Sequence, residues 1–151
     1  MSFAHSNGIL AGSVAACFGL LVGCSSNNNT TSPGNTGDGG ATAATFTEVY
    51  TTIIGTTCTD HHSGANPSGA LDMSTQAKAY ADLVGVKAAG PSCGTSGETR
   101  VVAGSHGTSL LYMKVAGTQT CGNQMPDGLT PISSDKVALI QSWIDDGALN
   151  N

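Results

Sequence analysis

Cys58-Thr59-Asp60-His61-His62 is the stretch from which the fold of this chain can be inferred. Its thiol and its second imidazole stand four residues apart, and side chains at i and i+4 share one face of a helical turn. In that geometry the thiol can bond to the edge of a flat ligand while the imidazole reaches its centre. His61, the i+3 neighbour of Cys58, would lie on the same side.

The residues before this pentapeptide predict an amphipathic helix. Its apolar face repeats at i, i+3, i+4, i+7 and i+8, positions that are occupied by Phe46, Val49, Tyr50, Ile53 and Ile54. Gly55 is expected to end this helix.

Three more helices are expected after the pentapeptide. Ser74 should cap the second, residues 109–115 form a short third, and Ser133 or Ser134 caps the fourth. Asp135 would lie in the first turn of the fourth helix, where the helix dipole favours a negative charge. The expected apolar faces are Ala77, Tyr80, Ala81, Leu83 and Val84; Leu110, Leu111 and Met113; and Val137, Leu139, Ile140, Trp143 and Ile144. Glycines follow the second and fourth helices, at Gly85 and Gly147. No alternating strand pattern accompanies them, so the predicted fold class is all-α, a small helical domain with long loops.

Several segments of this domain carry a resemblance to a known family. They are residues 58–64, 69–73, 79–84, 100–104, 109–115, 124–126 and 143–148. In this order, and with the Met-Pro and Trp-Ile-x-x-Gly-Ala pieces, they resemble the cytochrome c-like domains of bacterial surface lipoproteins. The resemblance covers nearly all of the chain from Phe46 onward. It implies a helical cytochrome c fold, a covalently bound haem c and one-electron transfer to an unidentified redox protein.

Carried over residue by residue, the resemblance makes Cys58 the thioether to haem, His62 the proximal iron ligand and Met125 the sixth ligand. Pro126 disfavours helix at residue 125 and suits an extended loop that presents the Met125 sulfur. A His/Met pair fits electron transfer, because both axial positions are filled and the potential is raised. The chain departs from the family's Cys-x-x-Cys-His motif, because His61 replaces the second attachment cysteine. Residues 103–106 also lack the prolines usual in the family. Met73 and Met113 are expected to be core residues.

The start of the chain predicts export. Residues 9–22 form an apolar stretch that is short for a membrane span but suits the central region of a signal peptide. It ends in Leu21-Val22-Gly23-Cys24, which resembles the lipobox of bacterial lipoproteins, although residues 1–8 contain no Lys or Arg. We therefore expect a signal peptide over residues 1–23, cleavage before Cys24 and a lipid on the Cys24 sulfur.

A lipid on Cys24 makes the membrane a partner of the protein. Ser25 does not resemble an inner-membrane retention signal, so the expected location is the outer membrane of a bacterial cell envelope. Residues 24–45 comprise the lipidated cysteine and a flexible linker, because they are rich in Ser, Asn, Thr, Gly and Ala. The expected domain spans residues 46–151.

Cysteine counting bears on the haem site. If Cys17 leaves with the signal peptide and Cys24 is lipidated, three cysteines remain in a domain whose exported location favours disulfides. Cys93 and Cys121 both fall in expected loops, and their pairing would leave Cys58 free for haem. The alternative pairs Cys58 with one of the other two and leaves no thioether.

Composition limits the other functions. The net charge is −5, and the five basic residues form no cluster along the sequence, which argues against nucleic-acid binding. One Trp, three Tyr and three Phe make a small core that would gain from a disulfide or a cofactor.

Three alternatives to the haem protein have different support. A cytochrome fold without haem, acting as a surface interaction or structural module, is the main one, and His61 supports it. A non-haem metal site could use His61, His62 and His106, but adjacent histidines on a helix point about 100° apart. His106 is expected to be a solvent-exposed surface residue. A hydrolase has little support because Gly-x-Ser-x-Gly is absent and residues 103–107 resemble it only loosely. An electron carrier or a binding module is therefore expected rather than an enzyme.

Overall fold

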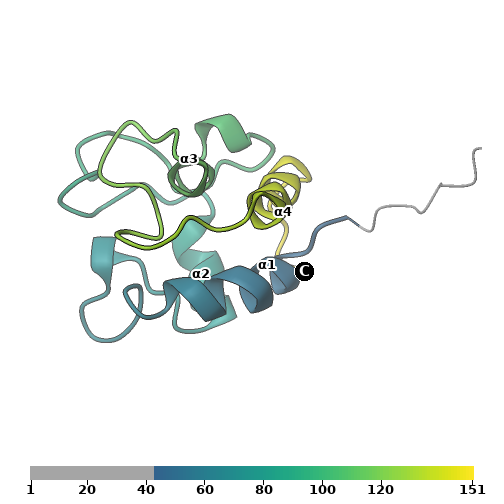
Figure 1. Ribbon diagram of the computed structural model, residues 1–151, viewed down its shortest axis with the longest axis horizontal. Helices are drawn as coiled ribbons and strands as arrows, with labels where there is room; N and C mark the ends of the chain where they lie inside the picture. The colour runs from purple at the N-terminus through teal and green to yellow at the C-terminus, as the bar shows by residue number, and fades with distance from the viewer. Residues whose placement is uncertain (1–42) are drawn as a thin grey trace, which may run out of the picture. The chain divides into compact units, whose positions relative to one another are not determined.

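The computed structural model describes residues 43–151, which form helices and loops and contain no strand (Figure 1). This is compatible with the predicted all-α class. The expected signal peptide, Cys24 and the linker up to residue 42 lie outside the described residues. Ala44 and Thr45 already belong to the folded domain, since Ala44 is buried in the core and Thr45 caps the first helix. No helix within residues 43–151 is long and apolar enough to cross a membrane.

The first helix runs through α1 (Phe46–Val49) and continues as η1 (Tyr50–Cys58), which is wound as a π-helix. The Thr45 hydroxyl accepts the Glu48 N–H at 3.1 Å, as a helix N-cap does. Four residues of the predicted apolar face are buried, and they are Phe46, Val49, Ile53 and Ile54.

The prediction that Gly55 ends the first helix is wrong. A glycine ends a helix when it adopts the left-handed conformation, and Gly55 is not among the glycines with positive φ. Threonine hydroxyls also bond to carbonyls of the last turns, from Thr56 to the Thr52 oxygen at 3.2 Å and from Thr59 to the Gly55 oxygen at 3.3 Å. The helix continues through Gly55 and ends at Cys58.

Three α-helices follow, α2 (Gln76–Leu83), α3 (Leu110–Ala116) and α4 (Ser134–Asp145). Two short 3-10 turns, η2 (Ser68–Ala70) and η3 (His106–Thr108), lie between them and the first helix or each other. Ser133 is the N-cap residue of α4, as predicted. Gly147, just beyond α4, has a φ of 100°.

The second helix differs from the prediction. Its cap is Thr75, whose hydroxyl accepts the Lys78 N–H at 3.3 Å, whereas the Ser74 hydroxyl accepts from the Lys78 ammonium at 3.2 Å. Ala77 and Ala81, predicted to face the core, are exposed, and Ala79 is buried instead. Ala79 and Leu83, which are four residues apart, are the buried residues of α2, so a narrow stripe of this helix packs against the core.

The core joins the two ends of the domain. The Phe46 ring lies 4.9 Å from the Trp143 ring and 5.2 Å from the Tyr80 ring between centroids, and such pairs add about 0.5–1.5 kcal/mol each beyond burial. The Phe46 N–H donates to the Asn151 side-chain oxygen at 2.9 Å, and the Trp143 indole donates to the Leu149 carbonyl at 2.9 Å. α4 accordingly packs against α1, and also against α3 (Figure 1).

Long loops complete the domain on the side of α3 away from α4 (Figure 1). Residues 84–109 are tied by single bridges that join Val84 to Val101, Lys87 to Thr99, and Thr99 to Ser109. Ser109, which precedes α3, is fully buried, and its hydroxyl donates to the Ser105 carbonyl at 2.8 Å. These contacts fix the loops against which the cavity described below is formed.

Candidate functional site

A cavity of about 560 Å³ lies between the end of η1, α3 and the loops after α2 and α3. Cavities that hold cofactors and small ligands measure roughly 300–1,000 Å³ and are mostly apolar. The walls include the apolar side chains of Ile53, Leu71, Leu83, Leu110, Leu111 and Ile132. The cavity is therefore large enough and apolar enough for an organic cofactor.

All three residues that the family resemblance assigns to haem line this cavity. Cys58 is the last residue of η1, His62 follows one turn later, and Met125 comes from the loop between α3 and α4. His61 also reaches the lining, although the residue as a whole is exposed. A thiol, an imidazole and a thioether thus meet in one site from two distant parts of the chain.

The orientation of the His62 ring is set by a backbone carbonyl. Nδ1 of His62 lies 2.8 Å from the Ser68 carbonyl oxygen, and a carbonyl can only accept, so Nδ1 carries the proton. The loop is closed by a second bond, from the Ser68 N–H to the His61 carbonyl at 2.9 Å. In the neutral ring the lone pair is consequently on Nε2, the arrangement of a metal-ligating histidine whose other nitrogen donates to a carbonyl.

Burial favours the neutral form of His62. Removal of the ring from water lowers its pKa below the ordinary value, and the hydrogen bond to Ser68 opposes this only in part. A neutral imidazole is the form that binds a metal ion.

Cys58 is a free, half-buried thiol. Burial raises its pKa from 9.0 to about 11, and the positive charge of Lys136 opposes the shift. The sulfur is therefore held as a neutral thiol, which makes it slow in thiol–disulfide exchange.

Two basic side chains that are distant in sequence meet at the cavity, Arg100 and Lys114. Arg100 is 6% exposed and donates to the carbonyls of Asp82, Gly69 and Ala70 at 2.8–2.9 Å. Burial lowers its pKa, and the Asp82 carboxylate opposes this. Among residues 43–151 neither cation forms a salt bridge with a carboxylate.

The Lys114 ammonium donates to the carbonyls of Cys121 and Asn123 at 2.8 and 3.0 Å. Burial lowers its pKa, and the carboxylates of Glu98 and Asp127 oppose this shift. Arg100 and Lys114 form no basic cluster along the sequence, because 14 positions separate them, so the pair could not be predicted from the sequence. Lys114 is half-buried, whereas Arg100 is buried, and a buried cation without a salt bridge to a carboxylate favours an anionic ligand group.

Met125 is half-buried and packs against the core. Its N–H donates to the Lys114 carbonyl at 2.9 Å, and its bond to Pro126 is cis. Met73 is 2% exposed, as expected of a core residue, whereas Met113 is only half-buried.

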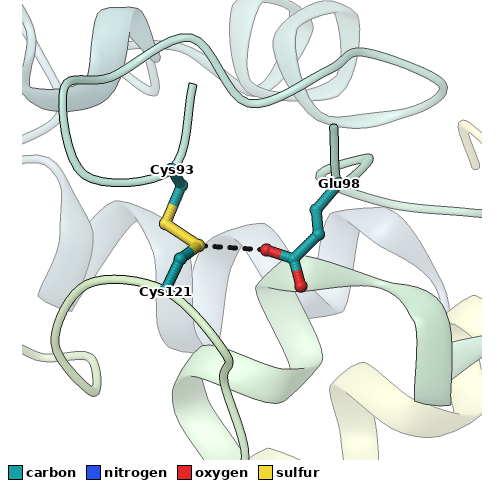
Figure 2. Close-up of side chains that lie close together, drawn as sticks. All are labelled: Cys93, Glu98 and Cys121. Atoms are coloured by element: carbon teal, nitrogen blue, oxygen red, sulfur yellow. Dashed lines mark hydrogen bonds between the residues drawn. A yellow bond between two sulfur atoms is a disulfide. The ribbon is translucent and has the colours of Figure 1, made fainter. Parts of the chain in front are cut away.

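Cys93 and Cys121 form a disulfide at the rim of the cavity, with an S–S distance of 2.05 Å and a Cα–Cα distance of 5.4 Å (Figure 2). One oxygen of Glu98 lies 3.0 Å from the Cys121 sulfur, and the other accepts from the Thr120 hydroxyl at 2.6 Å. A disulfide sulfur has no hydrogen to donate, so the contact drawn in Figure 2 becomes a hydrogen bond only if the pair is reduced.

A group of three side chains of the types His, Cys, Asp or Glu, spaced as metal ligands are, occurs at that same corner. In the described part of the chain, Cys93, Glu98 and Cys121 are the one group of three potential ligands close enough together to hold an ion. Their sulfurs are bonded to each other, so neither is a thiolate ligand. The alternative site built from His61, His62 and His106 is not formed.

His106 lies elsewhere, as the first residue of η3, and faces α4. Its Nδ1 is 2.8 Å from both carboxylate oxygens of Asp145, and its ring packs edge-on against Tyr112 at 4.7 Å between centroids. The expected solvent-exposed histidine is in fact only 33% exposed, because the carboxylate and the aromatic ring cover it. It ties η3 to α4 and takes no part in the cavity.

Comparisons of this chain with models of protein families, with curated proteins and with solved structures find no match.

Proposed function

We propose that this domain binds haem c in the cavity and passes single electrons outside the cytoplasm. The observation that carries the proposal is the His62–Ser68 hydrogen bond, which leaves Nε2 unprotonated in a cavity that also holds Cys58 and Met125. An imidazole lone pair and a thioether are the two ligands that the iron of a cytochrome c takes, and a thiol is the group through which its haem is attached.

The rest of the cavity also suits this ligand. Haem, when bound, would supply an iron that changes reversibly by one electron. The apolar walls would exclude water from the metal, and Arg100 and Lys114 would offset the negative charge of the porphyrin's carboxylates. His62 and Met125 would hold the iron between an imidazole and a thioether, a ligand pair that favours electron transfer over ligand activation.

Attachment would depend on Cys58 alone, because His61 occupies the place of the second cysteine. Cys58 would hold the haem by a thioether: its S–H would add across one vinyl group, with sulfur on one carbon and hydrogen on the other, so attachment would consume no oxidant. The Cys93–Cys121 disulfide supports this assignment, since it leaves Cys58 without a cysteine partner in the described residues.

The proposal includes the location of the protein. A lipid on Cys24 and a linker up to residue 45 would tether the domain to the envelope, on our inference the outer membrane. An electron carrier there would exchange electrons with another redox protein of the envelope.

Export of the full chain in a host with c-type haem maturation tests the proposal. Three proteins are compared, namely the natural chain, Cys58→Ala and His61→Cys, which completes Cys-x-x-Cys-His. We expect haem staining that survives denaturation in the natural chain, its loss in Cys58→Ala, and a reduced absorbance band at shorter wavelength in His61→Cys. The band should shift because a second vinyl group becomes saturated.

A folded, colourless natural chain would sink the proposal. If His61→Cys alone became coloured, the cavity would be competent for haem while the natural chain had lost attachment. That result would favour the haem-less interaction module.

A further inference from the structure

One side chain of α3, that of Lys114, donates two hydrogen bonds to the loop that carries Met125. Nζ of Lys114 donates to the carbonyls of Cys121 and Asn123, at 2.8 and 3.0 Å. The backbone carbonyl of the same lysine accepts the Met125 N–H at 2.9 Å. Lys114 therefore binds the loop at three positions, Cys121, Asn123 and Met125.

We infer that Lys114 is the positioning residue for the thioether of Met125. The inference rests on the proposed function for the role of the sulfur as an iron ligand. Hydrogen bonds from a charged donor are stronger than those between neutral groups. Two of them on alternate carbonyls fix the direction of the peptide chain between Cys121 and Asn123, and hence the approach to Met125.

The loop backbone is shaped to admit this ammonium. Gly122 has a φ of 61°, and a Cβ at this position would lie 3.0 Å from the Lys114 nitrogen and 3.2 Å from the Ser92 Cβ. A side chain at position 122 would thus be strained by its backbone and would also push the ammonium away. The glycine at position 122 is therefore compatible with the close approach of the Lys114 ammonium.

The disulfide does not by itself restrain the residues between Cys121 and Met125. It joins Cys121 to Cys93 and restrains the start of the loop, four residues before Met125. The Thr120 hydroxyl is bound to Glu98 at 2.6 Å, also at the start. Beyond Cys121, the contacts of Lys114 with Asn123 and Met125 continue the restraint toward the sulfur. The Asn123 side chain also donates to the Asp127 carboxylate at 3.1 Å.

The test compares Lys114→Met, Lys114→Arg and Lys87→Met in the full exported chain. Methionine keeps most of the side-chain volume but cannot donate, and arginine keeps the charge and can donate. Lys87 is the matched control, because its ammonium also donates to a carbonyl, that of Gly97 at 2.6 Å, and it does not line the cavity.

The first readout needs no haem and is the hydrogen exchange of the Met125 amide in the haem-free chain. We expect Lys114→Met to speed exchange about 10- to 100-fold, the factor that corresponds to losing charged hydrogen bonds. Lys114→Arg should restore most of the protection, and Lys87→Met should leave it unchanged.

The second readout is the sulfur-to-iron charge-transfer band of the oxidised, haem-loaded chain. It should weaken in Lys114→Met and persist in Lys114→Arg and Lys87→Met. A merely structural lysine would not change this band while the protein stays folded. Gly122→Ala provides a second route, and it should loosen the Met125 amide and weaken the band with Lys114 intact.

The outcomes separate the two proposals. An unchanged Met125 amide in both Lys114→Met and Gly122→Ala overturns the positioning inference, whether or not the chain is coloured. A colourless natural chain overturns the proposed function, and the amide measurement still decides what Lys114 does to the loop. If Lys114→Met does not fold, Gly122→Ala and Lys114→Arg decide by the same two readouts.

Discussion

His62 Nδ1 and the carbonyl oxygen of Ser68 lie 2.8 Å apart, and this single distance fixes the tautomer of the imidazole in the cavity. The partner is a backbone atom in a loop that the Ser68 N–H closes onto the His61 carbonyl. The chemistry of His62 thus depends on the shape of the chain over residues 61–68. Four predictions follow from this site and its surroundings.

Replacing His62 with Gln should flatten the pH dependence of stability of the haem-free domain. Burial lowers the pKa of His62 below its ordinary 6.5, so on acidification the unfolded chain binds the proton first. Between pH 6.5 and the lowered pKa, the free energy of unfolding must therefore fall as the pH falls. Gln cannot titrate but can still donate to the Ser68 carbonyl.

Urea unfolding at several pH values between 7.5 and 5 measures this effect. Asn66→Ala, an exposed and non-titrating change in the same loop, should keep the slope of the natural chain. Equal slopes for the natural chain and His62→Gln would show that His62 does not contribute to it.

Alkylation of Cys58 in the haem-free chain should be slow and should rise only at high pH. Burial raises the pKa from 9.0 to about 11, which lowers the thiolate fraction near neutral pH by a factor of ~100. Mass spectrometry of the Cys58 peptide after timed treatment with iodoacetamide gives the rate. In denaturant the rate should return to that of an ordinary thiol, and a folded-state inflection near pH 9 would contradict the buried-thiol assignment.

Removing the disulfide should destabilise the domain without abolishing the first helix. In Cys93→Ala/Cys121→Ala, loss of a link across 28 residues should cost about 2–4 kcal/mol of unfolding free energy. Chemical denaturation followed by circular dichroism measures the cost, and a loss near zero would show that the loops are held mainly by Arg100 and Lys114. Glu98→Gln, which keeps the disulfide, is the matched control for the contact at Cys121.

Arg100→Met should be among the more costly single changes. The guanidinium donates to three carbonyls, those of Asp82, Gly69 and Ala70, and a buried carbonyl left without a partner is unfavourable. We expect a loss of about 2–4 kcal/mol in unfolding free energy. Lys87→Met, at an exposed site, should cost less than about 1 kcal/mol. Equal effects of the two changes would mean that the bonds of Arg100 are replaced by water.

Much of the helical framework could be predicted from local patterns. Phe46 and Ile53 of the first helix, and Trp143 of α4, were each placed on an apolar face by helical spacing, and all three are buried. Residue spacing predicts them because it determines which residues share one side of a helix. Spacing was wrong for Ala77 and Ala81, which are exposed, and it does not determine where a helix begins or ends. Gly55 stays within its helix since glycine permits the left-handed conformation but does not require it, and the cap falls on Thr75 because Ser74 bonds to Lys78 instead.

The sequence by itself determined the grouping of Cys58, His61 and His62, the order of the helices and the positions of two cysteines in loops. These follow from residue type and from the spacing of residues close together in the sequence, which do not depend on the tertiary structure. Only the tertiary structure decided that Arg100 and Lys114 meet at the cavity of Cys58, His62 and Met125, and that the Ser68 carbonyl orients His62. Contacts between distant residues depend on how the loops fold back, and a backbone carbonyl, present in every residue, leaves no signal in the sequence.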